Sequence, residues 1–301
     1  RLVHDLGLTV VIAEHKLERV IQFADRIVHI NGDGVANVGT PEEILMQSPI
    51  APPIVHLAKA LSLKEIGLTV REMRRMTSDF RKDQPVVNQV GSTAQSDVVI
   101  SFEKIKVSYG NKQALKGISA NVHNGEIVAV MGRNGAGKSS LLKVLAGVNK
   151  PDAGVVHIKK QEPFELHGKK RRETIGFIPQ EPSDLLYGQS VKIECQQADR
   201  DNEIAEGSTF AFLSRLVPHI SEETHPNDLS EGQRLALVLS IVLSGNPELL
   251  VLDEPTRGLD YQAKNLFALA LKEYASTFNR PVLLATHDVE LVAELAHRVL
   301  F

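Results

Sequence analysis

The feature that most constrains this chain is a glycine-rich loop, residues 132–140, with the sequence GRNGAGKSS. It fits the pattern G-x-x-x-x-G-K-[ST], in which glycines let the backbone turn tightly and aim successive N–H groups inward. The apolar run EIVAVMG leads into the loop, and a helical segment, residues 139–146, follows it. A strand, a loop and a helix in this order predict an α/β domain that binds a phosphate group at the helix N-terminus.

The side chains of this loop are of the types that bind a nucleoside triphosphate together with Mg²⁺. Lys138 can reach the β- and γ-phosphates as a point charge, and the Ser139 hydroxyl can ligate the metal. The alternative is a glycine turn with a purely structural role, which the flanking strand and helix disfavour. We expect the nucleotide to contact, besides these two residues, Gly132, Asn134, Gly135, Ala136, Gly137 and Ser140.

A pair of carboxylates, Asp253 and Glu254, ends the apolar run 249–252. Parallel α/β sheets bind ligands at the carboxyl ends of their strands, so this position suits a catalytic role. Asp253 is predicted to hold the Mg²⁺ shell, and Glu254 to orient and deprotonate a water molecule. A lone Asp-Glu pair is usually a solvated turn, but the phosphate loop upstream favours the catalytic interpretation.

Strands and helices alternate from Val98 onward. The segments VVISFEKIKVSY and ALKGISANVH are expected to form antiparallel strands. The runs in EIVAVMG, ELLVLDEP and RPVLLATH are apolar throughout, as buried parallel strands are. The sequence therefore predicts an α/β fold with a mostly parallel core.

The chain also contains an internal repeat. Residues 9–29 and 281–301 align with an offset of 272 positions, with identical residues at seven places and a matching apolar run before His15 and His287. Each copy is expected to form a strand with the histidine at its end, then a helix and the start of another strand. Chance similarity is the alternative. We therefore predict three parts: residues 1–50, the tail of a first domain; residues 51–97, a connector with a polar linker at 84–97; and residues 98–301, a related second domain that lacks its C-terminal end.

The expected tail continues past the repeat. Residues 25–30 and 35–38 are predicted to be short strands around the turn Asn31-Gly32-Asp33-Gly34, and Thr40 is predicted to cap a helix that begins with Pro41.

Composition excludes several alternatives. The hydrophobic content of 43% and charged content of 24% are ordinary for a packed domain, and the net charge of −3 gives no sign of a nucleic-acid partner. A single cysteine, Cys195, rules out an internal disulfide and fits a reducing cytosol. No apolar stretch approaches the length of a membrane span. The start at Arg1, without Met or a signal peptide, suggests a cut inside a longer protein.

From Val98 to its end the chain resembles the ATP-binding-cassette (ABC) family, whose motifs occur here in family order. The resemblance implies a P-loop ATPase domain with a mixed, mainly parallel core sheet, an antiparallel β subdomain and a helical signature subdomain. Leu229-Ser230-Glu231-Gly232-Gln233 resembles the signature motif, although the family has glycine where Glu231 stands. That departure adds a carboxylate near the γ-phosphate.

The resemblance also implies roles for single residues. Tyr109 corresponds to the aromatic residue that stacks on adenine, and Gln180 to the glutamine that senses Mg²⁺ and faces the membrane partner. Asp260 lies in the D-loop, and His287 is the switch histidine that stabilises the γ-phosphate. In the family two such domains sandwich two ATP molecules. Ser230, Gly232 and Gln233 would then contact the nucleotide held by the partner domain.

Residues 14–18, 51–55 and 68–72 resemble the fused tandem ATPase subunits of energy-coupling-factor (ECF) importers. That family implies ATP-driven uptake of vitamins or transition-metal ions. Its ATPase lies on the cytoplasmic face of the membrane beneath a membrane-embedded T-component, with a separate S-component that chooses the substrate. Two alternatives stay open: a soluble tandem ATPase that acts on ribosomes, and a nucleotide-binding regulatory half with weak hydrolysis.

Overall fold

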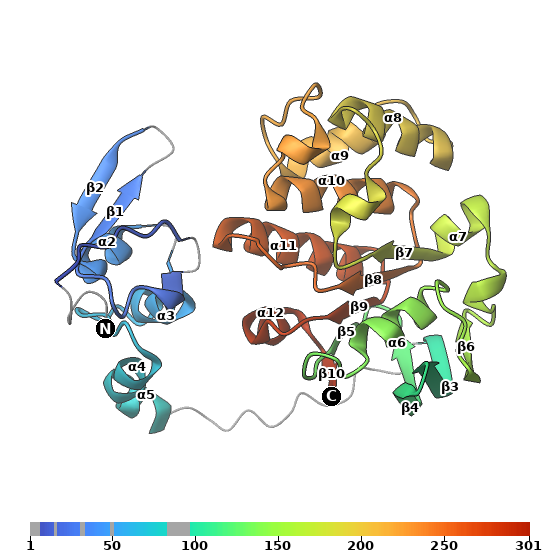
Figure 1. Cartoon of the computed structure of the whole chain (residues 1–301), viewed down its shortest axis with the longest axis horizontal. Coiled ribbons are helices and arrows are strands. Elements are labelled where there is room, and N and C mark those ends of the chain that lie inside the picture. Colours follow the sequence, from blue (N-terminus) through green and yellow to red (C-terminus); the bar gives the residue numbers. More distant parts are fainter. Residues whose placement is uncertain (1–6, 15–16, 31–33, 49–50, 83–96) are drawn as a thin grey trace. The chain divides into compact units, whose positions relative to one another are not determined.

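A computed structural model of the chain describes residues 7–14, 17–30, 34–48, 51–82 and 97–301. Contacts divide the chain into two compact units: residues 1–92 with 260–262, and residues 93–259 with 263–301. We call them unit 1 and unit 2; both are drawn in Figure 1.

Among the described residues, the core of unit 2 is a five-stranded sheet with the strand order β10-β5-β9-β8-β7, and each pair of neighbouring strands is parallel. Its strands are β5 (Ile127–Val130), β7 (Ile175–Ile178), β8 (Leu249–Asp253), β9 (Val282–Ala285) and β10 (Arg298–Leu300). The three central strands, β5, β9 and β8, are buried along their whole length. Burial on both faces explains their continuous apolar sequence and confirms the predicted parallel core.

Neighbouring residues of each central strand enter different hydrophobic clusters. Val251 and Leu283 pack in one cluster with α6, whereas Leu252 and Leu284 pack in the other with α10, α11 and α12. The alternation follows from the two-residue period of a strand. The helices that cover the sheet are α6 (Lys138–Leu145), α10 (Glu231–Ser244), α11 (Tyr261–Thr277) and α12 (Val289–Leu295).

A second, antiparallel sheet covers α6. It has the strand order β4-β3-β6, and its buried residues belong to the same cluster as α6. Its strands are β3 (Val98–Tyr109), β4 (Lys112–His123) and β6 (Ala153–Ile158). The two antiparallel strands expected at its start are confirmed.

Helices α8 (Val191–Asn202) and α9 (Ser208–Leu216) pack with α10 around a separate small core that includes the buried Cys195. The shorter elements of unit 2 are α7 (Gly168–Thr174), η2 (Pro163–Glu165), η3 (Pro182–Leu185) and η4 (Pro226–Asp228). Unit 2 therefore has the three expected layers: a parallel core, an antiparallel sheet and a helical subdomain that contains the predicted signature segment.

Unit 1 contains a β-hairpin and short helices. The hairpin pairs Ile27 with Gly39 and Ile30 with Ala36, and the predicted Thr40 cap is present with its Glu43 partner. Its elements are η1 (Leu17–Arg19), β1 (Ile27–Ile30), β2 (Ala36–Gly39), α2 (Pro41–Gln47), α3 (Pro53–Ala60), α4 (Val70–Met76) and α5 (Ser78–Lys82). The predicted tail and connector share one core: Ile21 and Leu45 cluster with Val55 and Met73.

Two expectations from the internal repeat are wrong. Residues 9–13 form no strand, and Val11 is 94% exposed; the helix expected after them is only the 3₁₀ turn η1. The counterpart in unit 2, β9, hydrogen-bonds to strands on both sides. A strand without such neighbours has no partners for its backbone groups, so the apolar run alone does not form one. His15 and linker residues 84–96 lie outside the described residues.

No helix within the described residues is both long enough and apolar enough to cross a membrane.

Candidate functional site

The phosphate loop connects the end of β5 to the start of α6. Gly137 caps α6 with a left-handed backbone, at φ +101°. A Cβ atom there would lie 2.7 Å from the carbonyl oxygen of Ala114 and 2.8 Å from Leu115 Cδ2. Strand β4 therefore presses against the loop, and only glycine fits at this position.

Lys138 lies inside this loop. Its ammonium donates hydrogen bonds to the carbonyl oxygens of Gly132 at 3.0 Å and Arg133 at 3.4 Å. It also lies 3.8 Å from Glu254 Oε1, with only 9% of the lysine side chain exposed. A partly buried cation at the N-terminus of a helix provides strong attraction for a phosphate group.

Asp253 is the last residue of β8 and is 2% exposed. The pKa of Asp253 is raised, mainly because the carboxyl group is buried. A hydrogen bond from the Ser139 hydroxyl lowers this pKa, whereas the nearby charge of Glu254 raises it further. Its Oδ1 atom is buried without a hydrogen-bond partner. A carboxylate oxygen without a partner, next to a hydroxyl group, fits Mg²⁺, which prefers oxygen ligands. Proteins commonly bind this ion through one or two such groups, and water and substrate phosphate oxygens complete its ligand shell.

Glu254 follows directly and has a left-handed backbone at φ +50°, which is unfavourable for a residue with a Cβ. Its N–H donates to the carbonyl oxygen of Ala285 at 2.8 Å. The carboxylate is 12% exposed, and its Oε2 lies 2.7 Å from His287 Nδ1 and accepts the His287 N–H at 3.3 Å. The structure thus brings Lys138, Glu254 and His287 together.

The strand order explains this convergence. Asp253 and Ala285 are paired across β8 and β9, so Glu254 and His287 leave the sheet at the same edge. Ala285 also pairs with Val130 on β5, shortly before the loop. The Thr286 N–H donates to the Val130 carbonyl oxygen at 3.3 Å, which fixes the backbone next to His287.

Tyr109 belongs to the antiparallel sheet. It ends β3, is 51% exposed, and its hydroxyl accepts a hydrogen bond from Asn149 at 3.2 Å. It pairs with Lys112 across the hairpin, and the Lys112 ammonium comes within 4.0 Å of a Cβ built on Gly135. The hairpin turn therefore lies beside the phosphate loop. No sequence motif marks Lys112, and its one signal in the sequence is a basic side chain three positions after Tyr109.

The signature segment forms the start of α10, as expected. Ser230 caps the helix: its hydroxyl accepts the Gln233 N–H at 3.3 Å, and its own N–H donates to Gln233 Oε1 at 3.0 Å. Glu231, the departure from the family motif, forms an ion pair with Arg234 at 2.9 Å. Gly232 packs against α11, since a Cβ there would lie 2.8 Å from Ala263 Cβ. In the described part of the chain, no hydrogen bond or ion pair joins Ser230, Glu231 or Gln233 to the phosphate loop.

Gln180 and Asp260 are exposed. Within the described residues Gln180 makes no hydrogen bond to Ser139 or Asp253, so the metal role predicted for it stays a prediction. Glu181, the residue after Gln180, forms an ion pair at 3.1 Å with Arg257, which lies three residues before Asp260.

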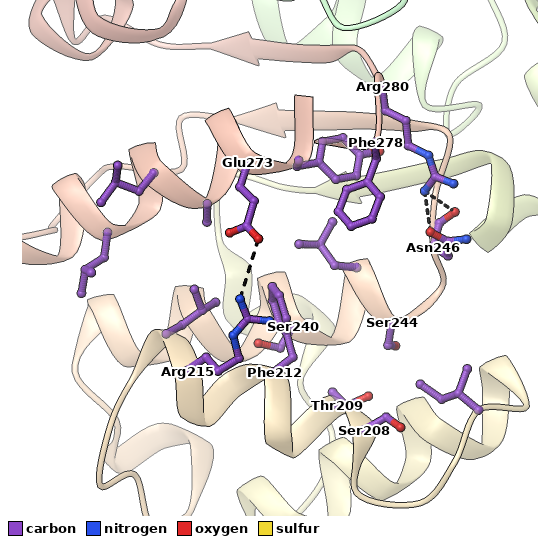
Figure 2. Close-up of a pocket in the computed structure, with 17 residues that line it drawn as sticks. Ser208, Thr209, Phe212, Arg215, Ser240, Ser244, Asn246, Glu273, Phe278 and Arg280 are labelled. Carbon is purple, nitrogen blue, oxygen red and sulfur yellow. Dashed lines mark hydrogen bonds and ion pairs between the residues drawn. The ribbon is translucent and has the colours of Figure 1, made fainter. Parts of the chain in front are cut away.

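A cavity of about 400 Å³ lies elsewhere in unit 2, between α9, α10 and α11. Figure 2 shows Arg215 on α9 reaching Glu273 on α11 across this cavity, an ion pair of 3.7 Å. Arg280 at its edge donates to Asn246 and to the Pro247 carbonyl oxygen. None of the predicted site residues lines this cavity.

Comparisons with known proteins agree with this geometry. Residues 115–257 match the family described as ABC transporter. The chain is 42% identical to an ABC transporter ATP-binding protein of Streptomyces coelicolor, over 99% of the chain and 59% of that protein. It is 30% identical to one of Clostridium tetani, over 100% of the chain and 69% of that protein. The chain therefore spans less than two thirds of the length of the Streptomyces relative.

Solved structures show the same fold. A dimeric ATP-binding cassette bound to ADP and phosphate is 24% identical, with a TM-score of 0.58 over 65% of this chain and 90% of that one. The protein cbiO1 of Clostridium perfringens, part of the ABC transporter complex cbiONQ, is 30% identical, with a TM-score of 0.57 over 65% of this chain and 81% of that one. The chain therefore belongs to the family of ABC transporter ATP-binding proteins.

Proposed function

We propose that this chain binds ATP with Mg²⁺ and hydrolyses it, and that the hydrolysis drives transport through a membrane partner. The observation that carries the proposal is the convergence of Lys138, Glu254 and His287 at the ends of β5, β8 and β9. The loop N–H groups and the Lys138 ammonium would hold the triphosphate, and Tyr109 would contact the adenine. Bound Mg²⁺, held by Ser139 and Asp253, would supply positive charge to the β- and γ-phosphate oxygens.

Hydrolysis then needs a base for the attacking water and a group that stabilises the charge of the transferred phosphoryl group. Glu254, which contacts His287, would accept a proton from the water molecule while the water oxygen attacks the γ-phosphorus. The bond from the γ-phosphorus to the bridging oxygen of ADP breaks, and ADP and phosphate leave. His287 would stabilise the charge on the transferring phosphoryl group.

A second domain completes the site in this proposal. Within the described residues, no hydrogen bond or ion pair joins Ser230, Glu231 or Gln233 to the phosphate loop of the same chain, and Ser230 at the N-cap of α10 is exposed. A helix N-terminus of this kind can bind a phosphate held by another domain. The dimer found for the structurally similar cassette supports this sandwich. The partner is a second ABC domain, and closure of the sandwich is the mechanical step.

Unit 1 is proposed to be the end of a first ABC domain, followed by a connector. The repeat supports this, as do the apolar residues that unit 1 leaves exposed, such as Phe23 at 82% and Ile30 at 70%. In unit 2 the corresponding strands β9 and β10 pair with the sheet. In a fused tandem ATPase, the core of the first ABC domain would cover Phe23 and Ile30.

The transport class is proposed to be ECF-type import of a vitamin or a transition-metal ion. The similarity to cbiO1, a component of the cbiONQ complex, supports it. The chain would then lie on the inner face of the cell membrane, with a T-component and an S-component as partners. Co-purification with small integral membrane proteins is expected; co-purification with ribosomes would favour the alternative of a soluble tandem ATPase.

A direct test uses ATP turnover and nucleotide binding by the purified chain. Lys138→Ala is expected to weaken Mg-ATP binding by about 10-fold or more, because a charge-assisted hydrogen bond is lost. Glu254→Gln is expected to keep binding but lower kcat by roughly 100-fold or more, because the base is lost. Lys159→Ala, which removes an exposed cation paired with Glu248, is the control and should match wild type. Equal binding and turnover in all the variants would refute the proposal, and strong binding without turnover in wild type would favour a regulatory half.

A further inference from the structure

We propose that Lys264 is a positioning residue for His287: it anchors the first turn of α12 and thereby holds the histidine ring beside Glu254. The inference rests on the proposed ATPase activity and adds a residue to its machinery. No pattern in the sequence marks Lys264, which lies in the first turn of α11, far along the chain from the histidine.

The contacts of Lys264 are short and partly buried. Its ammonium lies 2.7 Å from Asp288 Oδ2 and 3.0 Å from Glu290 Oε2, and only 15% of the side chain is exposed. Burial lowers the pKa of this lysine, but its hydrogen bonds to the two carboxylates outweigh that effect, and the pKa is raised. The ammonium therefore stays charged, as a bridge between α11 and α12 requires.

Asp288 transmits this anchor to the histidine. It follows His287 directly, and its Oδ1 accepts the Leu291 N–H at 3.0 Å as the N-cap of α12. Its own N–H donates to the hydroxyl of Thr286 at 3.0 Å, and Thr286 is fully buried. The backbone on both sides of His287 is thus held by neighbouring groups.

The ring of His287 needs such support. It is 68% exposed, and within the described residues its only hydrogen-bond or ion-pair partner is Glu254. Its place therefore depends on the backbone that carries it. Without Lys264, the carboxylates of Asp288 and Glu290 would lose the cation that they share and repel each other, which would shift the start of α12.

The chain offers a matched control for this contact. Lys272 lies eight residues further along α11, about two turns away, and forms an ion pair with Glu294 of α12 at 3.0 Å. It joins the same two helices as Lys264 but does not touch the N-cap next to His287. Loss of either pair removes one bridge, and only loss of the first reaches the histidine.

The experiment measures steady-state ATP hydrolysis by the chain. Lys264→Ala is expected to lower kcat by about 10-fold, with the KM for ATP within about twofold of wild type, because the defect is in the alignment of the water and the γ-phosphate. Lys264→Arg should restore most of kcat, and Lys272→Ala should match wild type. Lys264→Gln keeps most of the side-chain stem and replaces the alanine variant should that protein unfold.

A double-mutant cycle separates positioning from general destabilisation. In a His287→Ala background, adding Lys264→Ala should lower kcat by less than about twofold, because both changes act through the same ring. A full further loss of about 10-fold there, or equal rates for Lys264→Ala and Lys272→Ala, would overturn the inference. Wild-type chain without ATP turnover would instead refute the proposed function itself.

Discussion

Asp253 shows at the scale of one residue how the proposed site conflicts with stability. It is buried at the end of a central strand, and one of its carboxylate oxygens has no partner. Burial is the largest effect on its pKa and raises it. A raised pKa means that folding favours the protonated acid, so ionisation of Asp253 costs stability. In our proposal, the positive charge of the bound metal would offset this cost.

The conservative change Asp253→Asn should therefore raise the free energy of unfolding at pH 7, because an amide needs no ionisation. The difference should shrink as the pH falls through the raised pKa of the folded state, and it should be smallest below about 4, the ordinary pKa of an aspartate, where the wild-type acid is protonated in both states. Chemical denaturation of both proteins at several pH values measures it. Mg²⁺-dependent ATP turnover should be lost in the same variant. A variant less stable than wild type at neutral pH would contradict this explanation.

Helix α10 combines a structural and a functional role at the scale of one element. Its N-cap, Ser230, satisfies the first turn through Gln233, and the same exposed terminus is proposed to bind a phosphate of a partner domain. Glu231 lies beside it, but the ion pair with Arg234 offsets its charge. The carboxylate that departs from the family motif is therefore partly neutralised within the first turn of the helix.

Ser230→Ala should separate these roles when it is compared with Ser190→Ala. Ser190 caps α8 in the same subdomain, where its hydroxyl accepts the Ile193 N–H at 3.3 Å. Both changes are expected to cost about 1 kcal/mol of stability, since each removes one cap. Only Ser230→Ala should also lower ATP turnover. Stability from denaturant unfolding and kcat from phosphate release test the pair, and equal turnover in both variants would argue against a phosphate contact at Ser230.

At the scale of the whole molecule, the phosphate loop and the signature segment belong to one unit, but no hydrogen bond or ion pair joins them among the described residues. The loop follows β5, whereas the signature segment opens a helix that packs with α8 and α9. A complete site therefore requires two domains in our proposal, and activity should depend on their association.

Mixing two inactive variants tests this directly. Lys138→Ala disables the loop, and Ser230→Arg blocks the signature segment with a large side chain. In a mixed dimer one site would combine an intact loop with an intact signature segment. Turnover of the mixture should therefore exceed the mean of the separate proteins and rise with protein concentration. A rate equal to that mean would count against a sandwich of two copies.

Short stretches of sequence predicted the chemistry that we propose for this protein, because the residues of the phosphate loop, and those of the carboxylate pair, are adjacent in the chain. Apolar runs likewise predicted β5, β8 and β9, since burial on both faces leaves a continuous signal. The same kind of run failed to predict a strand at residues 9–13, because no strand in the described part of the chain pairs with them.

Only the tertiary structure decided which of these parts meet. The strand order places β5, β9 and β8 side by side, and this order brings Lys138, Glu254 and His287 to one edge. It also aligns α11 with α12, so that Lys264 reaches Asp288. Strand order and helix packing depend on burial summed over residues far apart in the chain, and no local pattern records that sum.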